Sequence, residues 1–206
     1  MVNPSKPHQS SEAYCDSCGE NVRIATILQD QGRQITTCTQ CGFPIQQRQD
    51  IPENPKLETV IIVEDTDLVR QILSEIMVKT GFARKIISCR NGEEFLTTVT
   101  EMLAGQKPVG MVFLDVLMPV LDGVDAALAL RAIERGLKSP KPIPILFFTV
   151  KKCDEEFRKI LHRVSPALYV NKEADASPQQ LMQRLQNIVT RLSTPGQIPS
   201  FLQAKK

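Results

Sequence analysis

Side chains that could hold a metal ion or a phosphoryl group follow four apolar runs of the sequence. The residues that end these runs are Glu64 with Asp65, Asp115, Thr149 and Lys172. Apolar runs without internal charge are typical of strands buried on both faces of a parallel sheet. Because the carboxyl ends of such strands meet at the edge where ligands bind, we expect these side chains to converge. A carboxylate can accept a phosphoryl group where neighbouring charges are neutralised, and Mg²⁺ prefers carboxylate oxygens.

Four cysteines form a second candidate site near the N-terminus. They stand as two Cys-x-x-Cys pairs, Cys15 with Cys18 and Cys38 with Cys41, and a glycine follows each pair. Two such pairs can complete a tetrahedral thiolate site for Zn²⁺, and glycine suits the positive φ of the turn. Alternating residues between the pairs predict a β-hairpin, so residues 14–45 resemble a zinc ribbon. A redox dithiol is the competing interpretation, but it needs one pair in a thioredoxin-like context.

Composition excludes few functions but bears on the role of the ribbon. The 206 residues have 42% hydrophobic content and a formal net charge of +2, typical of a soluble globular protein. Residues 1–56 carry five basic and six acidic side chains, and thiolates on Zn²⁺ would add negative charge. We therefore favour a protein-contact module over a nucleic-acid reader, because phosphate backbones repel such a surface. The sequence shows neither a signal-like segment nor a membrane-spanning run, so we expect a cytoplasmic protein.

The remaining chain alternates between strand-like and helix-like segments. Five strands and five helices predict a doubly wound α/β domain with a five-stranded parallel sheet, preceded by the small β domain. The expected organisation is a disordered tail at 1–13, the ribbon at 14–45, a linker at 46–57, the α/β domain at 58–193 and a C-terminal tail at 194–206. The helix starts include Asn91 before Gly92 and Ser177 before Pro178.

The α/β segment resembles a response regulator receiver domain, the phosphoryl-accepting half of two-component signalling. The residues that carry the resemblance are Glu64 and Asp65, Asp115 with Met118-Pro119 and Asp122-Gly123 after it, Thr149, Tyr169 and Lys172. The resemblance implies a flavodoxin-like fold with Asp115 as the phosphorylated residue. It also implies that a sensor histidine kinase or a phosphotransfer protein supplies the phosphoryl group.

The same resemblance implies a role for each matched residue. Asp65 and Asp115 would ligate Mg²⁺ directly, Glu64 would act through water, and the Leu117 carbonyl would complete the protein ligands. Lys172 would balance the phosphoryl oxygens, Thr149 would hydrogen-bond them, and Tyr169 would reorient as the switch aromatic. The protein would be no enzyme beyond its own phosphoryl transfer and dephosphorylation. It would signal to a downstream protein, with a homodimer on phosphorylation as one route.

Two positions depart from the family pattern, and they leave alternatives open. Glu173 stands where the family usually has proline, and Val150 stands where a small residue is usual. Leu117 occupies a position that tunes dephosphorylation, and we hypothesise that its apolar side chain hinders the attacking water. The alternatives are a nucleic-acid-binding or transcription regulator controlled by the receiver, a pseudo-receiver scaffold that is never phosphorylated, and a phosphohydrolase with an aspartyl nucleophile.

Overall fold

A computed structural model describes residues 12–28, 34–45, 57–172 and 177–193 of the chain. The predicted C-terminal tail, most of the predicted linker and nearly all of the predicted N-terminal tail lie outside these residues. None of the helices in the described part is long and apolar enough to span a bilayer.

The N-terminal module is an antiparallel sheet of three strands in the order β1-β2-β3. The strands are β1 (Glu12–Cys15), β2 (Glu20–Leu28) and β3 (Gln34–Cys38). The β2–β3 pair confirms the hairpin predicted between the two cysteine pairs. Strand β1 was not predicted, and it starts two residues before the expected ribbon because Glu12 pairs with Arg23. The module buries Val22, Ile35 and Phe43, a core too small to support a domain alone.

The larger unit is built on a parallel five-stranded sheet in the order β5-β4-β6-β7-β8. Its strands are β4 (Leu57–Val63), β5 (Ala83–Cys89), β6 (Met111–Leu114), β7 (Ile145–Thr149) and β8 (Ala167–Asn171). All residues of β6 and β7 are buried, as the apolar runs predicted. The reversal of strand order beside β4 places a topological switch point next to Glu64 and Asp115, which is where such sheets bind ligands.

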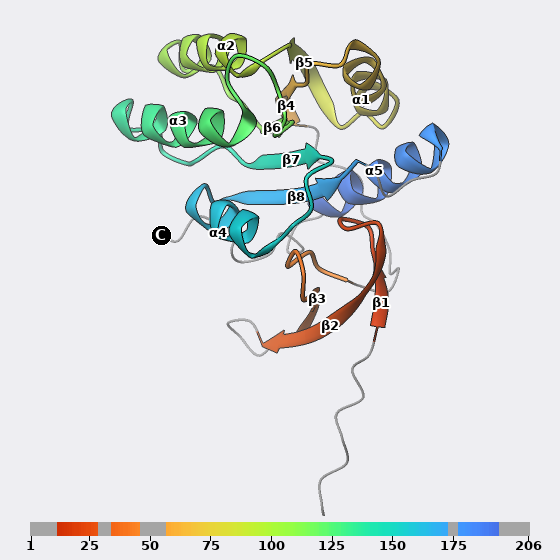
Figure 1. Ribbon diagram of the computed structural model, residues 1–206. Coiled ribbons are helices and arrows are strands. Elements are labelled where there is room, and N and C mark those ends of the chain that lie inside the picture. Colours follow the sequence, from red (N-terminus) through yellow and green to blue (C-terminus); the bar gives the residue numbers. More distant parts are fainter. Residues whose placement is uncertain (1–11, 29–33, 46–56, 173–176, 194–206) are drawn as a thin grey trace, which may run out of the picture.

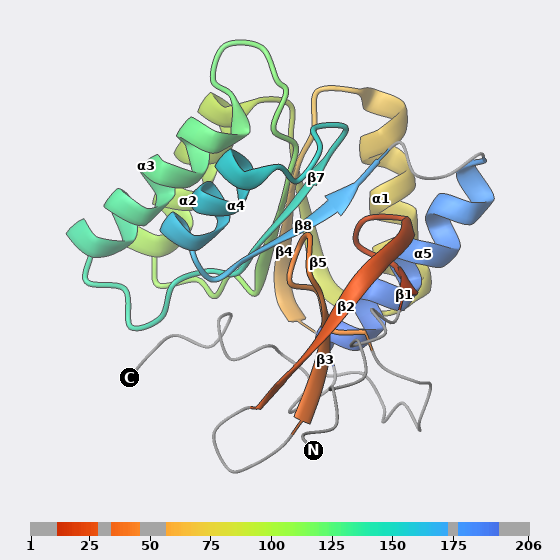
Figure 2. The ribbon, with the colours of Figure 1, turned by 60° about the horizontal axis from the view of Figure 1, so that its bottom comes forward.

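Five helices cover this sheet on both faces. They are α1 (Asp67–Lys79), α2 (Gly92–Ala104), α3 (Gly123–Gly136), α4 (Glu155–Arg163) and α5 (Pro178–Ser193). Helices α1 and α5 lie on one face, and α2, α3 and α4 on the other (Figures 1 and 2). Capping fixes the starts of α2 and α3: Asn91 and Asp122 each accept a hydrogen bond at 2.9 Å from the N–H three residues ahead. The flavodoxin-like fold expected from the sequence is confirmed.

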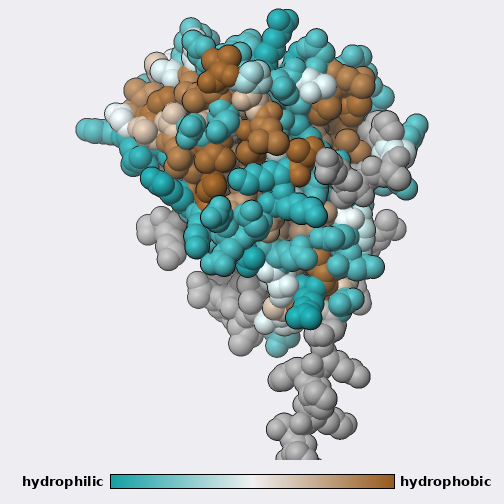
Figure 3. Space-filling view, in the orientation of Figure 1, coloured by the Kyte–Doolittle hydropathy of each residue, from teal (hydrophilic) through white to brown (hydrophobic). Residues whose placement is uncertain are grey.

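The three-stranded module is docked on the larger unit beside β8, between α4 and α5 (Figure 2). Contacts come from all three elements, through Arg158 of α4, Asn171 of β8 and Arg184 of α5. Figure 3 shows apolar surface mainly over the upper part of the molecule, around α2 and α3, while the docked module beneath is mostly hydrophilic. Within the module, Val22, Ile35 and Phe43 are buried, whereas Tyr14 of β1 is half-exposed.

Candidate functional site

Three carboxylates meet at the carboxyl edge of β4 and β6, as the sequence predicted. The Asp115 N–H donates to the Val63 carbonyl at 2.9 Å, which extends the β4–β6 ladder and brings Asp115 beside Glu64. One oxygen from each of Glu64, Asp65 and Asp115 lies within 4.8 Å of the others. Glu64 and Asp115 are buried and Asp65 is exposed, so the cluster opens to solvent on the Asp65 side.

Lys172 supplies the positive charge of this edge. Its Nζ lies 2.6 Å from Glu64 Oε2 and 2.7 Å from Asp115 Oδ2, and its side chain is only 13% exposed. The backbone holds it there, because the Lys172 N–H donates to the Thr149 carbonyl at 2.9 Å. One ammonium thus joins two carboxylates that come from different strands, an arrangement that leaves one net negative charge from these three groups.

Burial sets the proton affinity of the innermost acid. Desolvation raises the pKa of the Glu64 carboxyl, and the nearby Lys172 ammonium partly opposes that rise. The Glu64 carboxylate is therefore costly to keep charged unless cations neutralise it. Three carboxylates with one open side fit Mg²⁺, which takes a few protein oxygens and keeps waters or phosphate oxygens at its other positions.

The switch residues implied by the resemblance, Thr149 and Tyr169, lie on the neighbouring strands β7 and β8. Thr149 is fully buried at the end of β7, and its Oγ1 accepts a hydrogen bond from the Lys151 N–H at 3.2 Å. Tyr169 is 2% exposed and packs edge-on against Phe157 of α4 at 5.8 Å between ring centroids. Both predicted switch residues are therefore inside the fold and not on its surface.

Leu117 and Val150 both face solvent. Leu117 is 56% exposed, and its N–H donates to Asp115 Oδ1 at 3.3 Å, so it lies directly beside the candidate phosphoryl acceptor. Val150 is 37% exposed at the end of β7. Glu173 lies outside the described residues.

The Asp-Gly pair after the acceptor has a steric explanation. Asp122 caps α3, and the Gly123 N–H donates to the Val116 carbonyl at 2.9 Å. A Cβ on Gly123 would stand 1.9 Å from the Asp115 carbonyl oxygen. Only glycine lets the first turn of α3 approach the acceptor loop this closely.

The four predicted zinc ligands also converge. All four sulfurs lie within 4.8 Å of one another, with 3.7 Å from Cys15 Sγ to Cys41 Sγ and 3.8 Å from Cys18 Sγ to Cys38 Sγ. Sulfurs at the corners of a tetrahedron with Zn–S bonds of about 2.3 Å would be about 3.8 Å apart, so the distances fit Zn²⁺.

The turns that hold the sulfurs have the predicted backbone. Gly19 and Gly42 have φ of 74° and 76°, the left-handed region that glycine tolerates. The Cys41 N–H points at Cys38 Sγ at 3.4 Å. Hydrogen bonds from neighbouring thiols, that of Cys15 first, lower the pKa of Cys38, whereas the bond with Cys15 raises the pKa of Cys18. A shared proton network of this kind is what a divalent cation replaces on binding.

Two residues at the docked face were missed by sequence reasoning. Ser17 is fully buried, and its hydroxyl donates to the Tyr169 carbonyl. Arg184 is 3% exposed, and its guanidinium donates to the Asp16 carbonyl at 2.8 Å and to the Asn171 carbonyl. Nothing in the sequence links Ser17 to a strand more than 150 residues away, and no motif marks Arg184.

Comparison with known proteins places the larger unit in a family. The family model of the response regulator receiver domain matches residues 60–186, more than half of the chain. The chain therefore belongs to the response regulator receiver family. The N-terminal cysteine cluster fits a zinc-ribbon-like module joined to that receiver domain.

The matched proteins include two transcriptional regulators. The probable transcriptional regulator ycf27 of Porphyra purpurea is 30% identical over 150 residues, which are 70% of this chain and 55% of that protein. The alkaline phosphatase synthesis transcriptional regulatory protein PhoP of Bacillus subtilis is 29% identical over 133 residues, 64% of this chain and 48% of that protein. The chain thus spans about half the length of these curated relatives.

A solved structure agrees with the fold. The receiver domain of the Arabidopsis thaliana histidine kinase CKI1, crystallised with Mg²⁺ and BeF3⁻, superposes with a TM-score of 0.53 at 22% identity. The match covers 64% of this chain and 89% of that chain. At this identity the likeness concerns the fold alone.

Proposed function

We propose that the protein is a two-component response regulator of the cytoplasm that accepts a phosphoryl group on Asp115 in a Mg²⁺-dependent reaction. The donor would be a phosphohistidine of a sensor kinase or a phosphotransfer protein. The observation that carries the proposal is the position of Lys172, whose ammonium contacts Glu64 and Asp115 at once. An ammonium there would neutralise phosphoryl oxygens that arrive on Asp115.

The transfer makes one bond and breaks one. A carboxylate oxygen of Asp115 forms a P–O bond, while the donor's P–N bond breaks and its electron pair stays on the donor nitrogen. Glu64, Asp65 and Asp115 would hold Mg²⁺, which supplies positive charge to the phosphoryl oxygens when bound. Later attack by water on phosphorus breaks the same P–O bond, returns the Asp115 carboxylate and releases inorganic phosphate.

Thr149 and Tyr169 would turn the modification into a change of shape. The Thr149 hydroxyl lies at the end of β7, where it would hydrogen-bond the new phosphoryl oxygens. Its movement would alter the packing beside Tyr169 and so the region around α4 and α5. We further propose that the ribbon, residues 14–45, binds Zn²⁺ and serves protein contact, while residues 58–193 form the receiver and output passes to a downstream protein.

The decisive experiment is the intact mass of the zinc-loaded chain after incubation with Mg²⁺ and acetyl phosphate. Wild type should gain the mass of one acid-labile phosphoryl group, and Asp115→Asn should gain none. Asp125→Asn is the matched control, because this exposed acid of α3 lies outside the carboxylate cluster. An unmodified wild type that also fails to bind Mg²⁺ would contradict the proposal and favour the pseudo-receiver scaffold.

A further inference from the structure

The ribbon is attached to the free edge of the receiver sheet through its first metal-binding loop. Strand β8 is an edge strand, so its outward N–H and C=O groups would otherwise face solvent. Ser17, inside the loop between Cys15 and Cys18, satisfies two of them. Its carbonyl accepts from the Asn171 N–H at 2.9 Å, and its hydroxyl donates to the Tyr169 carbonyl.

Helix α5 closes this junction with one side chain. The buried guanidinium of Arg184 donates to carbonyls on both sides of it, those of Asp16 and Ser17 in the loop and that of Asn171 in β8. Hydrogen bonds from a charged donor to buried carbonyls are stronger than neutral ones, and losing them leaves buried groups unsatisfied. The loop conformation that brings Cys15 and Cys18 together is therefore also the conformation that fits β8.

The junction lies next to the phosphoryl site along the chain. Asn171, which pairs with Ser17, immediately precedes Lys172, whose ammonium lies 2.7 Å from Asp115 Oδ2. The Lys172 N–H is also bonded to the Thr149 carbonyl at 2.9 Å. Movement of Lys172 or Thr149 toward an incoming phosphoryl group would thus act on the residue that holds the ribbon.

The ribbon also confines the switch aromatic. Phe147 pairs with Tyr169 across β7 and β8, so Tyr169 and Thr149 project from the same face of the sheet. The Tyr169 ring packs against Phe157 and is 2% exposed with the ribbon in place. A movement of the Thr149 side chain toward Asp115 would open space beside the buried side of the Tyr169 ring. That space would favour the buried position that the ring already occupies.

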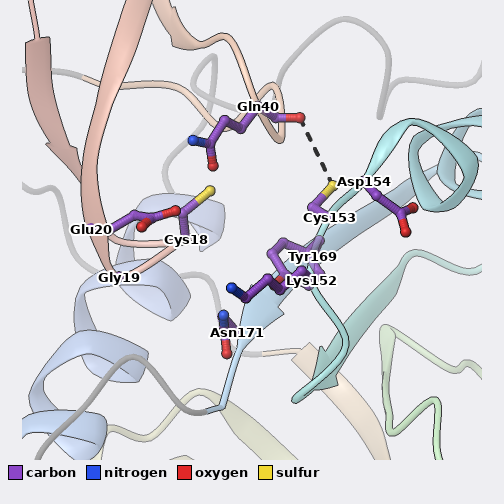
Figure 4. A pocket seen from close by; sticks show the side chains of 9 residues that line it. All are labelled: Cys18, Gly19, Glu20, Gln40, Lys152, Cys153, Asp154, Tyr169 and Asn171. Atoms are coloured by element: carbon purple, nitrogen blue, oxygen red, sulfur yellow. Dashed lines mark hydrogen bonds between the residues drawn. The ribbon is translucent and has the colours of Figure 1, made fainter.

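A cleft beside the junction allows such movement. Figure 4 shows it between the ribbon, with Glu20 and Gln40, and the segment after β7, with Lys152 and Cys153, and Tyr169 lies between the two sides. Its volume is about 570 Å³. A weak contact bridges it, from Cys153 Sγ to the Gln40 carbonyl at 3.9 Å. The ribbon is therefore fixed at β8 and loosely packed against the segment that follows Thr149.

We propose that the docked ribbon and the phosphorylated receiver stabilise each other, so that zinc retention by the four cysteines rises when a phosphoryl group occupies Asp115. The physical link is the shared β8 backbone, with Ser17 and Arg184 as positioning residues. This inference rests on the proposed function of Asp115. By linkage the effect is reciprocal, so a ribbon that retains zinc also favours the phosphorylated state.

The test measures how much zinc-selective chelator removes half of the Zn²⁺ from the full chain. One arm contains Mg²⁺ with beryllofluoride, a stable mimic of the phosphoryl group, and the reference arm contains Mg²⁺ with fluoride alone. Fluorine NMR reports whether beryllofluoride is bound, with Asp115→Asn as the blank. Couplings between sites are typically about 5- to 150-fold. We expect wild type to need at least about fivefold more chelator in the beryllofluoride arm.

Two variants and two controls locate the link. Ser17→Ala removes the hydroxyl bond to β8, and Arg184→Met removes the guanidinium between loop and strand, so each should reduce the shift. Thr26→Ala, an exposed hydroxyl of β2, and Arg163→Met, an exposed arginine of α4, should keep it. If Arg184→Met does not fold, Ser17→Ala still decides the matter.

The outcomes separate this inference from the function on which it rests. Bound beryllofluoride with an unchanged or smaller chelator requirement overturns the inference and leaves the proposed function intact. A wild-type shift that persists in full in Ser17→Ala and Arg184→Met also overturns it. Absence of beryllofluoride binding in wild type removes the proposed function and the inference together.

Discussion

Replacing Gly123 with alanine tests the closest approach in the phosphoryl site. The added Cβ would lie 1.9 Å from the Asp115 carbonyl oxygen, whereas carbon and oxygen need about 3.3 Å. The first turn of α3 must therefore retreat by roughly 1.4 Å, which breaks the 2.9 Å bond from the Gly123 N–H to the Val116 carbonyl. The lost bond costs about 1 kcal/mol and the strain about 1–3 kcal/mol, so we expect a loss of roughly 2–4 kcal/mol.

Gly136→Ala is the matched control in the same helix. A Cβ there meets nothing within 4 Å, so alanine should leave stability unchanged or raise it by up to about 1 kcal/mol. Urea unfolding of the zinc-loaded chains, followed by circular dichroism, compares the two. For an m-value near 2 kcal/mol/M, the Gly123→Ala midpoint should fall by roughly 1–2 M. Equal midpoints for Gly123→Ala and Gly136→Ala would refute the steric argument.

Three further substitutions or treatments probe the charge, the thiols and the lifetime of the modified state. Lys172→Met should destabilise the Mg²⁺-free chain by about 3 kcal/mol at pH 7, because it removes the cation shared by Glu64 and Asp115. Loss of Lys172 also raises the pKa of Glu64 further, so this carboxyl takes up a proton as the pH falls toward 5. The difference in urea stability between wild type and Lys172→Met should therefore be smaller at pH 5 than at pH 7. An equal difference at the two pH values would contradict this. Burial raises the pKa of Cys153 from 9.0 to about 11. Iodoacetamide at pH 8 should therefore modify this thiol about 100-fold more slowly than an unperturbed thiol, and the rate should rise with pH. Peptide mass spectrometry measures the rate, and the rate of an unperturbed thiol would contradict the burial of Cys153. Leu117→Asn should shorten the lifetime of the phosphoryl group severalfold if the exposed leucine hinders the attacking water, and an unchanged decay of the intact-mass adduct would sink that idea.

The part of the site that lies at strand ends was predictable from sequence. Asp115 and Lys172 each follow an apolar run, and the carboxyl edge of a parallel sheet brings such ends together whatever the loops do. The cysteine spacing likewise predicted four sulfurs in one place, because each pair is local and the hairpin between the pairs is short. Local pattern and sheet topology were sufficient in both cases.

What joins the two units was not predictable in this way. Ser17 and Arg184 meet β8 through bonds to backbone carbonyls, and every residue offers a carbonyl, so no side-chain pattern marks the partners. The buried pair of Arg131 and Glu134, 2.6 Å apart, was missed for a related reason. An i, i+3 pair on a helix usually faces solvent. Here the pair is buried, and the Arg131 guanidinium also donates to the Val164 carbonyl at 2.9 Å.

The covering of β8 by the ribbon also bears on self-association. An open parallel sheet has two edges, and each is a template for pairing with another chain. At one edge, β5 carries the exposed Arg84 and Lys85, charges that discourage a second strand from adding. At the other edge, β8 is apolar, and Ser17 takes the place that a foreign strand would use. If the ribbon binds Zn²⁺ as proposed, loss of the metal would uncover an aggregation-prone edge, and the metal supply would govern the solubility of this protein as well as the fold of its smallest part.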